Sequence, residues 1–166
     1  MLCKNRFILL SNSKNKYSSY IGSAMQGAMY ELLDEEYVEV LHESKLHPYS
    51  QYVCREGENL VWTICTLNKN AYKEILEKVN QISEIELKSK NDKMTLKQNE
   101  AETIEYENLI KEYYFGRNER RITIEFLTTT SFKQRGNYII YPDIRLIFQS
   151  LMKKYDVSSI FENVPK

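Results

Sequence analysis

Hydrophobic and polar positions divide the first part of the chain into a strand and a long helical segment. Residues 6–12 (RFILLSN) form a short apolar run that predicts a strand. Residues 22–33 (GSAMQGAMYELL) have helical spacing and small side chains, and Gly27 among them is expected to allow close packing on a sheet. The helical pattern resumes after the acidic residues 34–36 and ends near His42.

The period changes from helical to alternating at residue 49. Residues 49–53 alternate apolar and polar side chains, Gly57 and Asn59 favour a turn, and residues 60–67 (LVWTICTL) are rich in strand-forming types. This pattern predicts a hairpin.

A helix and a strand complete the first unit. Residues 70–82 place apolar side chains at helical intervals, and residues 84–96 alternate again. The resulting order, β-α-β-β-α-β, is typical of the α+β ferredoxin-like (RRM-like) fold, in which two helices back a four-stranded antiparallel sheet. We therefore predict a ferredoxin-like domain over residues 1–100.

A second unit is predicted beyond a connecting segment at residues 101–119. Its pattern fits the opening strand and first helix of an incomplete second ferredoxin-like domain at residues 120–166. The expected elements are a short helix at 103–114, a strand at 120–127 (RRITIEFL), a turn at Gly136 and Asn137, and an amphipathic helix at 143–155.

The charge balance argues against a uniformly basic nucleic-acid binder, because 23 Lys and Arg oppose 23 Asp and Glu. The charges are nevertheless uneven. Residues 1–30 carry four bases and no acid, residues 31–44 carry six acids and no Lys or Arg, and residues 117–154 carry eight bases against three acids. Either a local basic face or an ordinary solvated surface explains this distribution.

Apolar runs and cysteines bear on location. No run approaches the roughly 18 residues of a membrane span, and the N-terminal apolar stretch is too short for a secretory signal. Cys3, Cys54 and Cys65 lack metal or redox spacing, and Cys54 and Cys65 should not face each other across the hairpin. We expect a cytoplasmic protein with three small buried or half-buried thiols and no membrane partner.

Histidine is the side chain best suited to proton transfer near neutral pH, and the chain has two, His42 and His47. By themselves they fit surface or structural roles better than catalytic ones. Glu39 and Glu43 flank His42 at helical spacing, but no second cluster completes a metal site. Phosphate-binding glycine loops are absent too, and Gly22 and Gly27 are read as packing glycines, so neither metal nor cofactor is expected.

Metal-free RNA cleavage needs only a few catalytic groups. A base takes the proton of the 2′-hydroxyl, an acid protonates the leaving 5′-oxygen, and a cation stabilises the charged transition state. A histidine, a lysine and a tyrosine can supply these roles. DNA lacks the 2′-hydroxyl and would be bound without being cut.

Several strings resemble one family. They are residues 20–24 (YIGSA), 27–30 (GAMY), 41–43 (LHE), 126–133 (FLTTTSFK), 136–142 (GNYIIYP) and 146–151 (LIFQSL). On these strings the chain resembles the CRISPR-associated endoribonucleases of the RAMP superfamily, which cut repeat RNA within a precursor transcript. The resemblance runs over essentially the whole chain.

The resemblance implies two tandem ferredoxin-like domains and metal-independent cleavage of CRISPR repeat RNA that leaves a 2′,3′-cyclic phosphate. It assigns proton transfer to His42, orientation or acid–base support to Tyr30, and the phosphate charge to Lys45. His47 remains the rival base. Other subunits of the interference complex and a homodimer are further possible partners. The expected RNA-binding cations are Lys14, Lys16, Arg120, Arg121, Lys133 and Arg135.

Two departures from the family pattern stand out. Thr129 occupies a position where the family commonly has proline, and the family's glycine-rich loop near the C-terminus has no counterpart here. We therefore expect the chain to end inside its second domain.

The assignment of Tyr30 and His42 to one site requires a bend. The two residues are 12 positions apart, which in one straight helix would separate them by about 18 Å and about 120°. A helix break near residues 34–36 is therefore predicted.

Two other functions compete with the nuclease. One is a non-catalytic RNA-binding module of the same fold, with Tyr52 or Trp62 stacking on bases, although Trp62 also fits a core position. The other is a ferredoxin-like protein-interaction domain.

Overall fold

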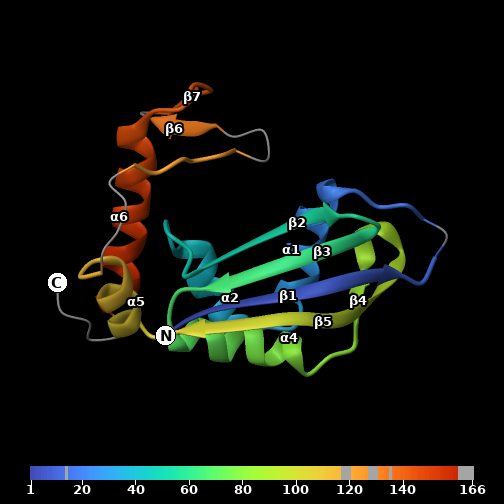
Figure 1. The fold of residues 1–166 in the computed structure, drawn as a ribbon. Coiled ribbons are helices and arrows are strands. Elements are labelled where there is room, and N and C mark those ends of the chain that lie inside the picture. Colours follow the sequence, from blue (N-terminus) through green and yellow to red (C-terminus); the bar gives the residue numbers. More distant parts are fainter. Residues whose placement is uncertain (14, 117–120, 127–130, 135, 161–166) are drawn as a thin grey trace. The chain divides into compact units, whose positions relative to one another are not determined.

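A computed structural model of the chain describes residues 1–13, 15–116, 121–126, 131–134 and 136–160. The chain forms two compact units, Met1–Tyr106 and Glu107–Lys166 (Figure 1).

The first unit is built on a five-stranded antiparallel sheet in the order β2-β3-β1-β5-β4 (Figure 1). The four strands β2, β3, β1 and β5 have the ferredoxin-like order, and β4 adds an edge strand. The strands are β1 (Leu2–Ser11), β2 (Tyr49–Glu56), β3 (Asn59–Thr66), β4 (Glu84–Leu87) and β5 (Asp92–Ile104).

The single strand predicted at residues 84–96 is wrong, because β4 and β5 form a hairpin there. A short 3-10 turn, η3 (Lys88–Lys90), leads to Asn91, whose φ of 49° reverses the chain. The buried positions change phase across this turn, from Ile85 and Leu87 to Met94 and Leu96. Two strands meeting at a turn explain that phase change, whereas one strand cannot.

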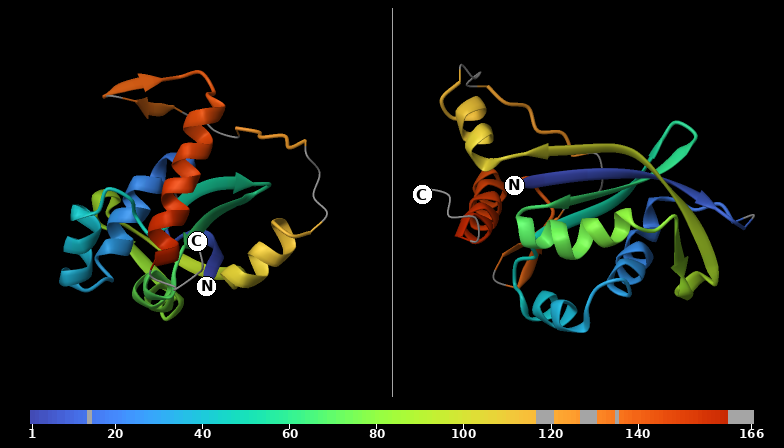
Figure 2. Two further views of the ribbon diagram at one scale, coloured as in Figure 1. Left: turned by 90° about the vertical axis from the view of Figure 1, so that its left-hand side faces the viewer. Right: turned by 90° about the horizontal axis from the view of Figure 1, so that it is seen from below.

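Helices cover one face of the sheet (Figure 2). The first helical region contains the 3-10 turn η1 (Ser19–Ile21), α1 (Gly22–Tyr30) and α2 (Glu35–Glu43). The second runs through α3 (Lys69–Ala71), a π-helical turn η2 (Tyr72–Glu77) and α4 (Lys78–Asn80). Its start is capped by Asn68, whose side-chain oxygen accepts from the Ala71 amide.

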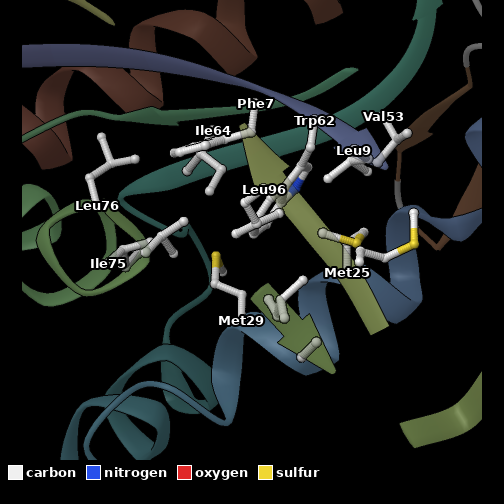
Figure 3. Packing of buried hydrophobic residues seen from close by; sticks show 14 of the residues in the cluster. Phe7, Leu9, Met25, Met29, Val53, Trp62, Ile64, Ile75, Leu76 and Leu96 are labelled. Carbon is white, nitrogen blue, oxygen red and sulfur yellow. The ribbon is translucent and has the colours of Figure 1, made fainter. Parts of the chain in front are cut away.

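The core lies between these helices and the sheet (Figure 3). Along β1 every second side chain is buried, from Cys3 to Leu9, which matches the period of a strand with one covered face. Trp62 on β3, Met25 on α1 and Ile75 on η2 are completely buried against that face. Burial of apolar area on this scale is the main force holding the unit together.

The glycines of α1 are not the packing glycines that the sequence indicated. A Cβ atom added at Gly22 or Gly27 would meet no atom within 4 Å, and Gly27 is exposed. Their neighbours Ala28 and Met29 make the contact with the sheet instead. The helix therefore leaves open space above Gly27.

Cysteine positions agree with the predicted hairpin. Cys54 pairs with Val61 and Cys65 pairs with Ser50 across β2 and β3, so the two thiols do not face each other. Within the described residues, Cys3, Cys54 and Cys65 form no disulfide bond.

The later elements begin with α5 (Tyr106–Tyr113), shorter than the helix predicted at 103–114 because β5 continues to Ile104. A hairpin of β6 (Phe132–Gln134) and β7 (Asn137–Ile139) turns at Gly136, whose φ of +85° favours glycine, which confirms the predicted turn. The predicted helix at 143–155 is also present, as α6 (Ile144–Ile160).

The strand predicted at residues 120–127 is wrong for the part that the structure describes. Residues 121–126 form no strand, and the two end residues lie outside the described ranges. Ile122 and Ile124 are 64% and 46% exposed. Alternation alone does not make a strand, because each strand needs a neighbour to complete its hydrogen bonds.

Within the described ranges, no helix is long and apolar enough to cross a membrane. The same residues contain no cluster of three His, Cys, Asp or Glu side chains that could hold a metal ion.

Candidate active site

Tyr30 and His42 come together because the helical region bends between them. The helix α1 ends at Tyr30, Asp34 is extended (φ −69°, ψ 140°), and α2 starts at Glu35. The rings of Tyr30 and His42 meet edge to face with centroids 5.6 Å apart. This confirms the predicted break near residues 34–36.

Buried leucines hold the bend in place. Leu33 in the turn is 8% exposed, and Leu41 on α2, next to His42, is completely buried. Anchored in this way, α2 keeps His42 at the surface beside Tyr30.

A buried tyrosine supports the Tyr30 hydroxyl. Tyr49, the first residue of β2, is 4% exposed, and its hydroxyl lies 2.7 Å from that of Tyr30. Gln26, one turn before Tyr30 on α1, donates from Nε2 to the Tyr49 hydroxyl at 2.7 Å. Burial, together with the hydrogen bond to Tyr30, raises the pKa of Tyr49, so this phenol stays neutral at physiological pH.

His47 contacts the same tyrosine from another side. Its ring centroid is 5.7 Å from that of Tyr49, and its buried Nδ1 has no hydrogen-bond partner among the residues that the structure describes. The two histidines therefore flank one pair of tyrosines. The sequence placed the two histidines in the same region but could not show that both contact this pair of tyrosines.

Two surface hollows meet at Tyr30 and His42, which line both. The smaller, of about 380 Å³, is lined by Ser23, Gln26, Gly27, Tyr30, His42 and His47 and contains no acidic side chain. We call it the histidine hollow. The open space above Gly27 belongs to it.

The larger hollow, of about 890 Å³, is acidic. Its lining includes Glu31, Glu35, Glu39 and Glu43, with Lys88 as its cation. Lys88 is already engaged, since its Nζ lies 3.0 Å from a Glu31 oxygen. A phosphate would be repelled here and accepted more easily in the histidine hollow.

Lys45 is exposed on the segment between α2 and β2 and lines neither hollow. The Ser44 hydroxyl donates to the Leu46 carbonyl at 2.8 Å, which folds the chain into a turn around Lys45. The structure thus brings Tyr30 and His42 together and leaves Lys45 outside the contact.

The predicted RNA-binding cations are spread over both units. Lys16 is exposed between β1 and η1 in the first unit. Arg121 and Lys133 are exposed in the second unit, where the Lys133 ammonium lies 5.9 Å from the ring centroid of Tyr138. Lys14, Arg120 and Arg135 lie outside the described residues.

An aspartate that the sequence reasoning missed anchors the segment containing Lys16. Ser11, Ser13 and Tyr17 all donate hydroxyl hydrogen bonds to Oδ2 of Asp92, and the Lys93 amide donates to Oδ1. These bonds lower the pKa of Asp92 to about 2, with the Ser13 bond the largest cause. The hydroxyl spacing at Ser11 and Ser13 was visible in the sequence, but their partner was 79 or more residues away.

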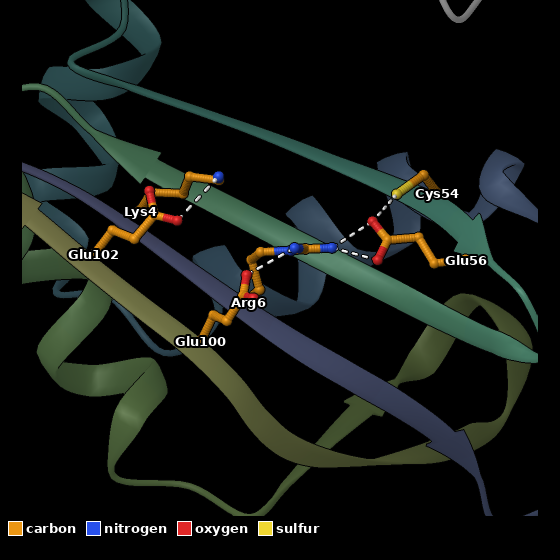
Figure 4. A network of polar contacts seen from close by, with 6 residues as sticks. All are labelled: Lys4, Arg6, Cys54, Glu56, Glu100 and Glu102. Carbon is orange, nitrogen blue, oxygen red and sulfur yellow. Dashed lines mark hydrogen bonds and ion pairs between the residues drawn. The ribbon is translucent and has the colours of Figure 1, made fainter.

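The sheet face opposite the helices carries paired charges (Figure 4). Arg6 bridges Glu56 and Glu100, and Lys4 pairs with Glu102 at 3.6 Å. Because these carboxylates neutralise Arg6 and Lys4, the two cations have little attraction for a phosphate backbone.

The two candidate stacking aromatics differ. Trp62 is completely buried and donates from Nε1 to Gln51, which confirms the core position and makes the alternative, stacking on bases, wrong. Its indole fills the core beside Phe7 instead. Tyr52 is 50% exposed.

Curated relatives match most of the chain. A CRISPR-associated endoribonuclease Cas6 from Streptococcus thermophilus is 34% identical over 142 residues, which are 84% of this chain and 56% of that protein. Proteins of the same name from two strains of Mycobacterium tuberculosis are 33% identical over 138 residues, 81% of this chain and 44% of theirs. This chain is homologous to the Cas6 endoribonucleases. The family resemblance found in the sequence is thereby confirmed.

The homology covers part of a Cas6 protein, because the chain spans about half the length of these curated relatives. A solved structure described as a Cas6 product complex matches 94% of this chain and 63% of its own chain, with a TM-score of 0.72 and 17% identity. That likeness confirms the ferredoxin-like fold. No family model matches the chain.

Proposed function

We propose that this chain carries the catalytic site of a metal-independent Cas6 endoribonuclease that cuts CRISPR repeat RNA. The observation that carries the proposal is the contact between Tyr30 and His42 at the edge of a hollow without acidic side chains. The homology to Cas6 endoribonucleases supplies the substrate class.

The reaction is an attack of the ribose 2′-oxygen on the adjacent phosphorus. A bond forms between the 2′-oxygen and phosphorus, the bond to the 5′-oxygen breaks, and the products are a 2′,3′-cyclic phosphate and a 5′-hydroxyl. His42 takes the proton of the 2′-hydroxyl as the 2′-oxygen attacks and returns a proton to the 5′-oxygen as it leaves, since it is the exposed histidine beside Tyr30. Tyr30 orients the phosphate through its hydroxyl.

Lys45 supplies positive charge for the transition state. Its segment is exposed and adjoins His42 in the chain, so its flexible side chain extends over the phosphate when RNA is bound. We therefore expect Lys45 to join the site only in the complex.

The position of the RNA follows from charge. The histidine hollow accepts the scissile phosphate, and the acidic hollow with Glu31, Glu35 and Glu39 keeps the flanking phosphates away. The proposed contacts to the RNA backbone are the exposed cations Lys16, Arg121 and Lys133, together with Lys14, Arg120 and Arg135.

The test is single-turnover cleavage of the cognate repeat RNA by the 166-residue chain in EDTA. We expect the unmodified chain to cut the RNA. In His42→Ala the single-turnover rate should fall by at least about a hundredfold, the contribution usual for general acid–base catalysis. Affinity for an RNA blocked by a 2′-deoxy group should stay nearly unchanged.

His47→Ala is the matched control, because His47 lines the same hollow. Retained cutting in this variant would assign proton transfer to His42, whereas the reverse pattern would make His47 the base. Binding without any product from the unmodified chain would favour the non-catalytic RNA-binding module. A requirement for magnesium would contradict the mechanism.

A further inference from the structure

We propose that Tyr49 is a positioning residue whose buried hydroxyl holds the Tyr30 hydroxyl beside His42 and directs its proton into the histidine hollow. The inference rests on the proposed function, because it concerns how that site is assembled. Tyr49 itself lies in the wall behind the site and does not line either hollow.

The position of Tyr49 is well determined by the sheet. It is the first residue of β2, pairs in register with Thr66 of β3 and is 4% exposed. Its ring meets that of Tyr30 edge to face at 6.3 Å and that of His47 at 5.7 Å. A side chain held by the strand and by two neighbouring rings has little freedom to move its hydroxyl.

The direction of the hydrogen bonds follows from counting donors and acceptors. A phenol has one proton to donate, and the Tyr49 oxygen already accepts from the Gln26 amide. Among the described residues, the Tyr30 hydroxyl is the one acceptor within hydrogen-bond distance of the buried Tyr49 hydroxyl. If Tyr30 donated instead, the Tyr49 proton would be buried without a partner, which is costly.

The hydrogen bonds therefore run from the Gln26 amide to Tyr49 and from Tyr49 to Tyr30. Tyr30 accepts from behind, so its own proton is free to point toward a phosphate oxygen in the hollow. The raised pKa of Tyr49 fits this arrangement, since a buried neutral phenol orients a neighbour and does not exchange protons with the substrate.

A double-mutant cycle tests the link between the two tyrosines. We expect Tyr49→Phe to lower the single-turnover rate about tenfold, the value of one well-placed hydrogen bond. Affinity for the 2′-deoxy RNA should not change. In a Tyr30→Phe background the same substitution should have almost no further effect, because Tyr49 acts through the Tyr30 hydroxyl.

Tyr72→Phe is the matched control. Tyr72 is a half-buried tyrosine of η2 that packs on the same core and lines neither hollow. The single-turnover rate of Tyr72→Phe should therefore equal that of the unmodified chain. Additive losses from Tyr49→Phe and Tyr30→Phe would mean a merely structural effect and would overturn the proposal. So would an unchanged rate in Tyr49→Phe.

A readout without RNA separates this proposal from the proposed function. Nuclear Overhauser effects between the Tyr30 and His42 rings, whose centroids are 5.6 Å apart, should weaken in Tyr49→Phe and persist in Tyr72→Phe. Undiminished effects in Tyr49→Phe would overturn the positioning role. If the unmodified chain does not cut RNA, the proposed function fails. The nuclear Overhauser effects between the two rings still test whether Tyr49 positions Tyr30.

Discussion

Four rings determine the chemistry that this chain can offer. His42, Tyr30, Tyr49 and His47 contact one another in that order, with centroid distances of 5.6, 6.3 and 5.7 Å. The buried member, Tyr49, contacts Tyr30 and His47, and Tyr30 in turn contacts His42; the three other than Tyr49 line the histidine hollow. These ring contacts, which join α1, α2 and the start of β2, form without RNA, and we expect Lys45 to join the proposed site only in the complex.

Sequence reasoning predicted that Tyr30 and His42 share a site, but it missed Tyr49 and Asp92 as organising residues. Tyr30 and His42 stood in strings that resemble a family, whereas Tyr49 looked like one more apolar position of an alternating strand. Its partners Gln26 and Tyr30 lie 23 and 19 residues away in the chain. Hydrogen bonds between such distant residues depend on tertiary packing, which no local pattern encodes.

The positive charge of Lys45 is predicted to contribute to the cleavage rate. Lys45→Ala should lower the single-turnover rate of repeat-RNA cleavage about tenfold to a hundredfold, because transition-state charge loses its cation. Lys45→Arg should recover part of the loss by keeping that charge. Equal rates for Lys45→Ala and the unmodified chain would remove Lys45 from the mechanism.

Gly27 tests whether the histidine hollow receives RNA. Gly27→Ala should raise the free energy of unfolding by about 0.5–1 kcal/mol, because alanine favours the helix interior and its Cβ meets nothing within 4 Å. Chemical denaturation measures this change. Gly27→Leu should fold equally well but weaken binding of 2′-deoxy repeat RNA, since its side chain extends into the hollow. Unimpaired binding by Gly27→Leu would place the RNA elsewhere.

The bend between α1 and α2 is the element that makes the site. It was predictable because a straight helix would have kept Tyr30 and His42 apart. The helices, the β2–β3 hairpin and the ferredoxin-like order also followed from periodicity. The β4–β5 turn and the π-helical turn η2 did not, since the first was concealed in a continuous alternation and the second depends on packing against the sheet.

Asp92 fixes the segment that joins β1 to the helices, and this contribution should depend on pH. Because the native pKa of Asp92 is about 2 and its ordinary value is 3.8, the native state favours the charged carboxylate. Its stabilisation is complete above the ordinary value and declines as the pH falls toward 2. Asp92→Asn should therefore lower the free energy of unfolding at pH 7, and the difference should shrink below pH 4.

Urea denaturation at pH 7 and at pH 3 measures that difference. Glu84→Gln is the matched control, because the Glu84 carboxylate accepts from Asn12 in the same segment but is exposed, and its substitution should cost little at either pH. If Asp92→Asn lowers the free energy of unfolding by the same amount at both pH values, that result would contradict the role of the carboxylate charge.

On the scale of the whole molecule, the two units differ in how well they bury apolar side chains. The first has a continuous core with Trp62, Met25 and Leu76 completely buried. In the described part of the second, large apolar side chains are widely exposed. They include Tyr114 at 79%, Ile140 at 70%, Tyr141 at 76%, Ile144 at 74% and Met152 at 65%.

This contrast predicts different association behaviour. Residues 1–106 should unfold cooperatively by themselves and remain monomeric, because their core is complete. The 166-residue chain should associate as its concentration rises, since exposed apolar patches favour contact with another surface. Sedimentation velocity over a range of concentrations measures this. A strictly monomeric 166-residue chain would contradict this prediction.

The central claim is that His42 and Tyr30 perform metal-free transfer of the phosphate to the 2′-oxygen. The most direct measurement is analysis of the RNA ends left after incubation of cognate repeat RNA with the chain in EDTA. We predict a 2′,3′-cyclic phosphate on the upstream product, its absence with His42→Ala, and no product from RNA with a 2′-deoxy group at the cut. A linear 3′-hydroxyl end, or cutting that needs added magnesium, would contradict the account.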